Sequence, residues 1–381
     1  MIDLLFRDKI EHMKKYIIAL SCLLVLSIIG TGLFVVERQN RHLSLTELVP
    51  SVTQYLPSIT PTPNVQVKTP PDRYVIPSAS YVGQTFNNCG PATLSMVMSY
   101  FGTQVSQDEL REQMRPFNNP AGGVDDKSVF AAEFVEYAQK YGFESVARPN
   151  GDLQMLKKLI ANDIPVVLRT WLHPNEDIGH FRIVRGYDDA RQVFIQDDSY
   201  EGRNLEYAYT TFDEMWKPFN YGYILVYPKD KADIVAAIVG ENMDEKVAYT
   251  NAKTRAEANL GNNPNSAYDL FNLSTAYFHL DDMQKSVEYY ERAQAAILPA
   301  RMLWYQIEPL QAYGAVGDHE RVFALTDWII RNNNVAFSEM YILRGKSYQA
   351  QGNIDAARAE FEKAVYYNKN LTTAKEALNI L

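Results

Sequence analysis

The last third of the chain contains an internal repeat, and this feature constrains the fold more than any other. Tyr277, Tyr313 and Tyr348 recur at spacings of 36 and 35 residues. Around them, small residues stand where two helices would touch, and aromatic residues stand where a core needs bulk. A period of this length indicates helix pairs that stack on one another, because one pair alone cannot bury its apolar face.

These positions resemble the tetratricopeptide repeat (TPR). The two best copies follow the same offsets. They align Leu270, Leu273, Ser274, Tyr277, Ser286, Tyr290 and Ala293 with Tyr341, Arg344, Gly345, Tyr348, Ala357, Phe361 and Ala364. A degenerate copy centres on Tyr313, residues 371–381 predict a closing helix, and 232–260 predict an incomplete further pair. The resemblance implies an all-α solenoid over 229–381 whose concave groove recruits a protein partner or substrate.

The composition limits the remaining possibilities. With 381 residues the chain is expected to form two or three domains. Its net charge is −9 and it shows no clustered Lys/Arg, so a nucleic-acid partner is not expected. Its two cysteines, Cys22 and Cys89, cannot form a disulfide framework, and a bridge between them is implausible because Cys22 lies in an apolar run. Cys89 is therefore expected to be a free thiol.

The N-terminal region predicts a membrane anchor. Residues 16–36 are 21 residues without a charge, enough to cross a bilayer core of roughly 30 Å. Basic residues before this run favour a short cytoplasmic segment, 1–15, with the bulk of a single-pass chain outside the cell membrane. A cleaved signal peptide and a lipidated Cys22 remain alternatives. The proline-rich stretch 37–72 predicts an extended linker that holds the following domain away from the membrane.

Residues 73–228 predict an α+β domain. Apolar residues at helical spacing, each run followed by glycine or a polar stop, indicate helices near 89–101, 128–142 and 152–163. Strand-like runs follow at 165–170, 180–187, 192–197 and 222–227, with a convincing turn between the second and third. Helices followed by consecutive strands with short connections imply an antiparallel sheet.

Cys89 stands where a thiol could act as a nucleophile. Pro91 suits the start of a helix, which places Cys89 at the positive end of the helix dipole. This position lowers the pKa of a cysteine and favours the thiolate. Gln84, five residues upstream, could donate an amide N–H to the oxyanion of an acyl-transfer intermediate. A buried, inert cysteine is the competing interpretation.

A partner base and acid follow much later in the chain. His180 opens one predicted strand, and Asp197 ends the next. In a hairpin closed by the turn near 188–191 these two strand ends are adjacent. The carboxylate could then orient the imidazole and stabilise its protonated form, which in turn activates the thiol.

The stretches around these residues resemble the papain-like cysteine peptidases of family C-39 over about 73–228. The resemblance implies that Gln84 is the oxyanion donor, Cys89 the nucleophile, His180 the general base and acid, and Asp197 the orienting acid. Asn88 stands where such motifs often have Asp. Asp198 replaces a frequent proline, so it competes with Asp197, which we prefer. The leader-processing members belong to exporters, whereas this domain is expected outside the membrane, so a double-glycine substrate is not carried over.

The function predicted from the sequence is a membrane-anchored cysteine hydrolase, best described as a peptidase, that needs no cofactor. His173 is a weaker candidate base than His180, because it precedes Pro174 in a polar loop. The loop 173–180 matches no zinc motif, so an exposed polar loop is preferred to a metal site. The alternative function is a non-catalytic scaffold that keeps the peptidase-like fold and binds peptide. Redox or metal-carrier chemistry is a distant third interpretation, since the sequence has no CxxC motif.

Overall fold

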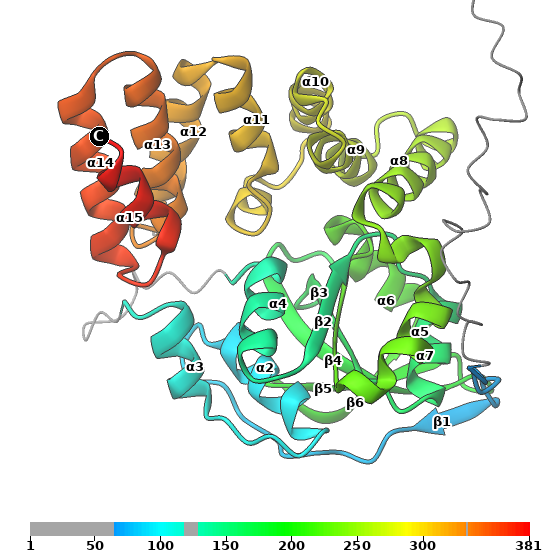
Figure 1. Ribbon diagram of the computed structural model, residues 1–381. Helices are drawn as coiled ribbons and strands as arrows, with labels where there is room; N and C mark the ends of the chain where they lie inside the picture. Colours follow the sequence, from blue (N-terminus) through cyan, green and yellow to red (C-terminus); the bar gives the residue numbers. More distant parts are fainter. Residues whose placement is uncertain (1–64, 118–128, 333) are drawn as a thin grey trace, which may run out of the picture. The chain divides into compact units, whose positions relative to one another are not determined.

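The computed structural model describes residues 65–117, 129–332 and 334–381 (Figure 1). The predicted segments 1–15 and 16–36, and most of the predicted linker 37–72, lie outside the described residues. Among the helices that the structure describes, none combines the length and apolar character needed to span a bilayer.

An antiparallel sheet of seven strands forms the centre of the first domain. Six strands follow the order β2-β7-β3-β4-β5-β6, and β1 pairs with β4 beside this path. The strands are β1 (Arg73–Val75), β2 (Glu144–Arg148), β3 (Val166–Trp171), β4 (Gly179–Asp188), β5 (Val193–Asp198), β6 (Gly202–Ala208) and β7 (Tyr223–Tyr227). The four predicted strands correspond to β3, β4, β5 and β7. The α+β prediction is confirmed.

Helices cover both faces of this sheet (Figure 1). On one face lie α2 (Cys89–Ser99), α3 (Gln107–Met114) and α4 (Ala131–Lys140); on the other lie α5 (Leu153–Ala161), α6 (Tyr209–Trp216) and α7 (Ala232–Val239). Successive strand residues feed the two cores alternately: Val167 packs with the α2 side, and Val166 and Leu168 pack with the α5 side. Each core is apolar and close-packed, which fixes the strand ends that carry the candidate site.

Three strands escaped prediction because their sequences carry little signal. β1 has three residues, and β2 and β6 lie at the two ends of the main strand path. β6 alternates exposed and partly buried positions and reads "GRNLEYA", which is mostly polar. Edge strands bury less apolar surface than central ones, so the pattern that reveals a strand is weak there.

The second region consists of helices. It comprises α8 (Glu245–Asn262), α9 (Ala267–His279), α10 (Met283–Ala295), the 3-10 turn η5 (Ala300–Trp304), α11 (Glu308–Val316), α12 (His319–Arg331), α13 (Ser338–Ala350), α14 (Ile354–Tyr367) and α15 (Thr372–Asn379). The aligned small residues lie where paired helices meet. Ser274 Oγ donates a 2.7 Å hydrogen bond to the Ser286 carbonyl, and Gly345 lies directly against the Phe361 ring. The all-α prediction is confirmed, and the degenerate middle copy forms the pair α11–α12.

Gly345 offers a test of this helix contact. A methyl group at position 345 would overlap the ring of Phe361, which is fully buried. We expect Gly345→Ala to lower the free energy of unfolding by about 2 kcal/mol, because overpacking of a close-packed core forces its neighbours apart. Gly261→Ala is the matched control: this glycine is also helical, and the added methyl group meets no atom within 4 Å. Thermal or denaturant unfolding should show a neutral or slightly stabilising effect for the control. Equal effects of the two substitutions would contradict the packing argument.

The helical region packs on the sheet domain through a shared apolar core. Trp171 at the end of β3 contacts Tyr305 edge-to-face, with ring centroids 6.0 Å apart. Lys217 forms a 2.5 Å ion pair with Asp269, whose side chain is buried. Asn368, near the chain's end, donates a 3.0 Å hydrogen bond to the Met114 carbonyl. The helical region therefore contacts the first domain both near its beginning and near its end.

Candidate functional site

Cys89 is the first residue of α2, and the loop before it is pinned by a side chain from α3. Gln107 Oε1 accepts hydrogen bonds from Asn88 Nδ2 at 2.8 Å and from the Thr85 N–H at 3.0 Å, while Gln107 Nε2 donates to the Gly83 carbonyl at 2.8 Å. Gly90 packs so closely on Val129 that a Cβ there would lie 2.8 Å from it. These contacts fix the thiol at the helix start. Sequence reasoning missed Gln107, because only the fold brings α3 to this loop.

The surroundings of Cys89 favour its thiolate. Burial acts to raise the pKa of the thiol, but a hydrogen bond to His180 and the positive charge of that ring lower it below its ordinary value. The charge of Arg169 acts in the same direction. The pKa of His180 is raised to about 9: burial lowers it, and hydrogen bonds to Asp198 and Cys89 outweigh that effect. Both shifts act in the direction that favours a protonated imidazole and a negatively charged sulfur.

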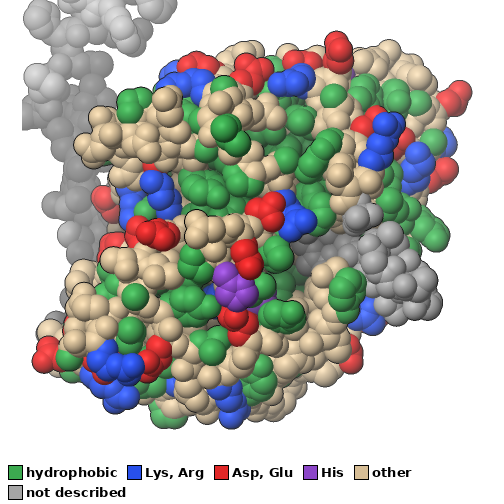
Figure 2. Space-filling model, turned by 180° about the vertical axis from the view of Figure 1, so that it is seen from behind, with side chains coloured by type: hydrophobic (Ala, Val, Ile, Leu, Met, Phe, Trp, Pro, Cys, Tyr) green, Lys and Arg blue, Asp and Glu red, His purple; other side chains and the backbone are tan. Residues whose placement is uncertain are grey.

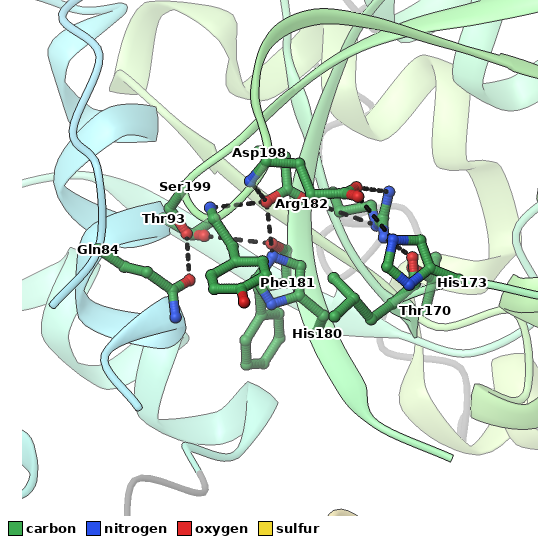
Figure 3. A network of polar contacts seen from close by, with 12 residues as sticks. Gln84, Thr93, Thr170, His173, His180, Phe181, Arg182, Asp198 and Ser199 are labelled. Carbon is green, nitrogen blue, oxygen red and sulfur yellow. Dashed lines mark hydrogen bonds and ion pairs between the residues drawn. The ribbon is translucent and has the colours of Figure 1, made fainter. Parts of the chain in front are cut away.

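His180 lies at the second residue of β4 and binds a carboxylate from β5. Its Nε2 is 2.8 Å from Asp198 Oδ1, and both side chains are almost fully buried (Figure 3). This contact leaves Nδ1 as the ring nitrogen available to the thiol. The same carboxylate oxygen accepts the backbone N–H groups of Tyr200 at 2.7 Å and Glu201 at 3.0 Å. Although burial acts to raise the pKa of Asp198, the bond to His180 and its charge lower it, so the carboxylate is ionised.

The prediction that Asp197 orients the imidazole is wrong; Asp198 does so. In the hairpin of β4 and β5, residues 186–188 pair with residues 193–195. If this register continued, Asp197 would lie opposite Val184, on the same face of the sheet as His180. A β-bulge at Arg185 adds one residue to β4 and shifts the register by one. Because side chains alternate across a strand, a shift of one residue moves Asp198 to the face of His180 and Asp197 to the opposite face.

Asp197 instead closes a buried polar network. Its Oδ2 accepts hydrogen bonds from Arg185 Nε at 2.9 Å, Ser78 Oγ at 3.0 Å and Tyr100 Oη at 3.1 Å, and its Oδ1 accepts the Asn204 N–H at 3.0 Å. These partners come from four separate parts of the domain. Asp197 therefore ties the N-terminal segment and α2 to the β4–β5 hairpin rather than serving the thiol.

Gln84 lies beside the other candidate residues with its amide oriented. Its side-chain oxygen accepts a 2.8 Å hydrogen bond from Ser199 Oγ, and its backbone N–H donates to the Ser199 carbonyl at 2.8 Å (Figure 3). With the oxygen committed to Ser199, the NH2 group points the other way. Gln84 lines the same cavity as Cys89 and His180. The structure thus brings three of the four predicted residues together and replaces the fourth by its neighbour.

Arg169 is a cation at the site that sequence reasoning did not identify. It belongs to β3, its guanidinium lies 4.3 Å from the Phe181 ring centroid, and Nη1 donates to the Tyr305 carbonyl at 2.9 Å. Burial lowers the pKa of Arg169 to about 10, which still leaves it charged at neutral pH. An arginine inside a strand pattern gives no local signal, so only the folded sheet reveals its place beside Cys89.

His173 lies apart from the thiol, in contact with acids of its own. It pairs with Glu201 at 2.6 Å and Glu176 at 3.0 Å, and these hydrogen bonds raise its pKa. Its side chain is 40% exposed, so it belongs to a polar surface loop. Over the described parts of the chain, no group of three or more His, Cys, Asp and Glu side chains is arranged to hold a metal ion.

A cavity of about 520 Å³ opens beside the thiol. Gln84, Cys89 and His180 line it, together with side chains from both regions of the chain. A cavity of this size accommodates several residues of an extended peptide or a comparable small ligand. A thiolate, a buried imidazolium and an oriented amide on its wall can attack a carbonyl, move a proton and hold an oxyanion.

Two regions of the chain match known families. Residues 66–224 match the Peptidase_C39 like family, and residues 270–296 and 338–371 match the tetratricopeptide repeat. The chain therefore carries a peptidase C39-like domain followed by TPR repeats. A search of curated proteins found no match.

Two solved structures are similar to parts of the chain. The peptidase domain of Streptococcus ComA, described as a bi-functional ABC transporter involved in a quorum sensing pathway, is 24% identical; the match covers 39% of this chain and 100% of that one, with a TM-score of 0.30. MamA is 16% identical, and the match covers 35% of this chain and 77% of that one, with a TM-score of 0.31.

Proposed function

We propose that this chain, with a peptidase C39-like domain followed by TPR repeats, is a cysteine peptidase that uses Cys89, His180, Asp198 and Gln84. The observation that carries the proposal is the buried line from the Asp198 carboxylate through His180 to the thiol at the start of α2, open to a cavity. A structural cysteine needs neither an imidazolium nor an ionised acid behind it.

The first half of the reaction forms a thioester. The Cys89 thiolate attacks the carbonyl carbon of a peptide bond, and a carbon–sulfur bond forms as the carbonyl electrons move to oxygen. The Gln84 amide and the backbone N–H of Cys89, at the start of α2, stabilise this oxyanion. When the tetrahedral intermediate collapses, the carbon–nitrogen bond breaks, and the His180 imidazolium gives its proton to the departing amine.

The second half releases the acid product. His180, now neutral, takes a proton from a water molecule, whose oxygen attacks the thioester carbonyl. The carbon–sulfur bond breaks, the carboxylic acid leaves, and the proton taken from water stays on His180 beside the regenerated thiolate. Asp198 remains ionised throughout and stabilises the imidazolium by its 2.8 Å hydrogen bond.

We further propose that the peptidase acts outside the cell membrane and that the TPR groove recruits a protein partner or substrate. The support for the location is the uncharged run 16–36 with basic residues before it and a proline-rich stretch after it. The support for the partner is the stacked helix pairs, whose concave face is the usual binding surface of such repeats.

Alkylation of Cys89 tests the chemistry without knowledge of the substrate. At pH 6 we expect iodoacetamide to react with Cys89 about 10²-fold faster in the unaltered protein than in His180→Ala. The reason is that a thiol with an ordinary pKa near 8.5 is about 0.3% ionised at this pH, whereas the proposal expects the thiol paired with His180 to be ionised to a much larger extent. The pH dependence, measured by mass spectrometry of the Cys89 peptide, should show reactivity that persists well below pH 8.

His173→Ala is the matched control, because this histidine contacts two acids and not the thiol. It should leave the alkylation profile unchanged. If Cys89 in the unaltered protein titrates as an ordinary thiol, the peptidase proposal fails, and the non-catalytic peptide-binding alternative takes its place.

A further inference from the structure

The TPR region supplies part of the wall around Cys89. Arg301, Trp304 and Tyr305, from η5 and the residue after it, line the cavity that Cys89 and His180 also line, and Asn334 joins them from the connection between α12 and α13. The peptidase domain alone would leave this side of the cavity open. The catalytic cavity is therefore composite.

The wall packs against the start of the strand that carries His180. Gly179, directly before His180, packs on the Tyr305 ring, where a Cβ would lie 2.9 Å from the ring. Arg301 Nη1 forms a 3.0 Å ion pair with Asp177, in the loop that leads into β4. These contacts link η5 to the backbone that positions His180.

Two donors on this wall have no hydrogen-bond partner among the residues that the structure describes. Asn334 is 4% exposed, and its Nδ2 has no partner among the described residues; the same holds for the buried Trp304 Nε1. A buried polar group without a partner costs roughly 1–3 kcal/mol, so such groups are usually satisfied. Both residues line the cavity, so a bound ligand with carbonyl oxygens would satisfy both donors if the two side chains turn toward it. The main chain of an extended peptide presents such oxygens at regular intervals.

The rest of the cavity favours apolar side chains and disfavours basic ones. Phe86, Ile178 and Tyr200 line it and are 63%, 42% and 65% exposed, although large apolar side chains are normally buried. None of the described lining residues is acidic, while Arg169 and Arg301 are both cations. Hydrophobic side chains also gather in the hollowed part of the face drawn in Figure 2. A Lys or Arg of a ligand would meet the like charges of Arg169 and Arg301, and the carboxylate beside Arg301, that of Asp177, is already paired with it.

We infer that the TPR region selects the substrate of the peptidase directly. Asn334 and Trp304 bind main-chain carbonyl groups of an extended peptide, the rim of Phe86, Ile178 and Tyr200 holds its apolar side chains, and Arg301 disfavours basic ones. The inference deepens the proposed function and takes the peptide substrate from it. It also assigns the repeats a role inside the catalytic cavity, in addition to any partner bound in their groove.

Protection of Cys89 from iodoacetamide measures this binding without requiring cleavage. The probes are two blocked pentapeptide amides, acetyl-Ala-Leu-Ala-Leu-Ala-amide and the same peptide with lysine for leucine. The leucine peptide should halve the alkylation rate at a concentration at least tenfold lower than the lysine peptide. Asn334→Leu keeps the side-chain size and removes the donors, and should raise the half-protecting concentration of the leucine peptide about five- to tenfold, the loss of one hydrogen bond. Trp304→Phe is a second variant with the same expectation, should the first fail to fold.

Asn265→Leu, at an exposed position outside the cavity, is the control for adding a leucine to the repeat region. It should leave the half-protecting concentration of the leucine peptide unchanged. Arg301→Gln should narrow the difference between the two peptides. Equal protection by both peptides, or unchanged protection in Asn334→Leu and Trp304→Phe, overturns the inference even if Cys89 is an activated thiolate. Conversely, if protection depends on these residues but Cys89 has an ordinary thiol pKa, peptide binding by the TPR region is supported and the proposed peptidase activity is rejected.

Discussion

Replacing Asp198 by asparagine is expected to lower peptide turnover about 10³-fold. The amide is the same size as the carboxylate and can still accept the backbone N–H groups that hold this position. It carries no charge, so it cannot stabilise the imidazolium of His180 or hold its pKa at about 9. Loss of the acid behind a catalytic histidine has an effect of this order on turnover.

The measurement uses a peptide that the unaltered protein cleaves, selected from a mixed peptide library. The fall should appear in kcat more than in KM, because Asp198 lies behind His180 and not on the cavity wall. Unfolding temperature, read by circular dichroism, checks that Asp198→Asn is folded. Turnover within a few-fold of the unaltered protein would remove Asp198 from the proposed catalytic line.

Replacing Asp197 by alanine is expected to cost about 3 kcal/mol of stability. Its carboxylate is the buried partner of Arg185, and the variant would leave that guanidinium without its 2.9 Å ion pair. Removing one partner of a buried ion pair is strongly destabilising, because the remaining charge stays desolvated and uncompensated. The donors on Ser78, Tyr100 and the Asn204 backbone lose their acceptor as well.

Denaturant unfolding measures this loss, and the alkylation rate of Cys89 at pH 6 provides the matched readout. Under conditions where the variant is folded, Asp197→Ala should keep the low-pH reactivity of Cys89, because its carboxylate lies on the other face of β5 from His180. Substitution of Asp197 should therefore lower the stability of the protein, whereas substitution of Asp198 should lower its catalytic activity. If Asp197→Ala had normal stability and a slow alkylation rate of Cys89, it would contradict the assignment of Asp198, and not Asp197, as the partner of His180.

Much of the site can be predicted from local sequence. Cys89 stands at a helix start because Pro91 suits the first turn, and His180 opens a run rich in β-branched and aromatic residues, which predicts a strand. The hairpin between β4 and β5 follows from two strand patterns around a short turn. These signals are local, because backbone preference and apolar period act within a few residues.

Local sequence signals cannot decide whether Asp197 or Asp198 binds His180. Both residues end the same strand, both are buried, and both are chemically competent. Their difference arises at Arg185, where β4 gains one residue relative to β5, and no turn or propensity signal marks that bulge. The bulge is stabilised by what Arg185 binds on folding, namely Asp197, the Ile76 carbonyl and Asn204.

The sequence by itself determined the two regions, the helix that starts at Cys89, the hairpin that carries His180, and the TPR pattern of the last third. Only the tertiary structure decided which aspartate binds His180, that Gln107 and Arg169 support the thiol, and that Arg301, Trp304 and Asn334 complete its cavity. The physical reason is the range of the interactions involved. Periodicity and capping act between neighbours in the chain, whereas strand register, buried ion pairs and the seam between two domains depend on residues that only the folded core brings together.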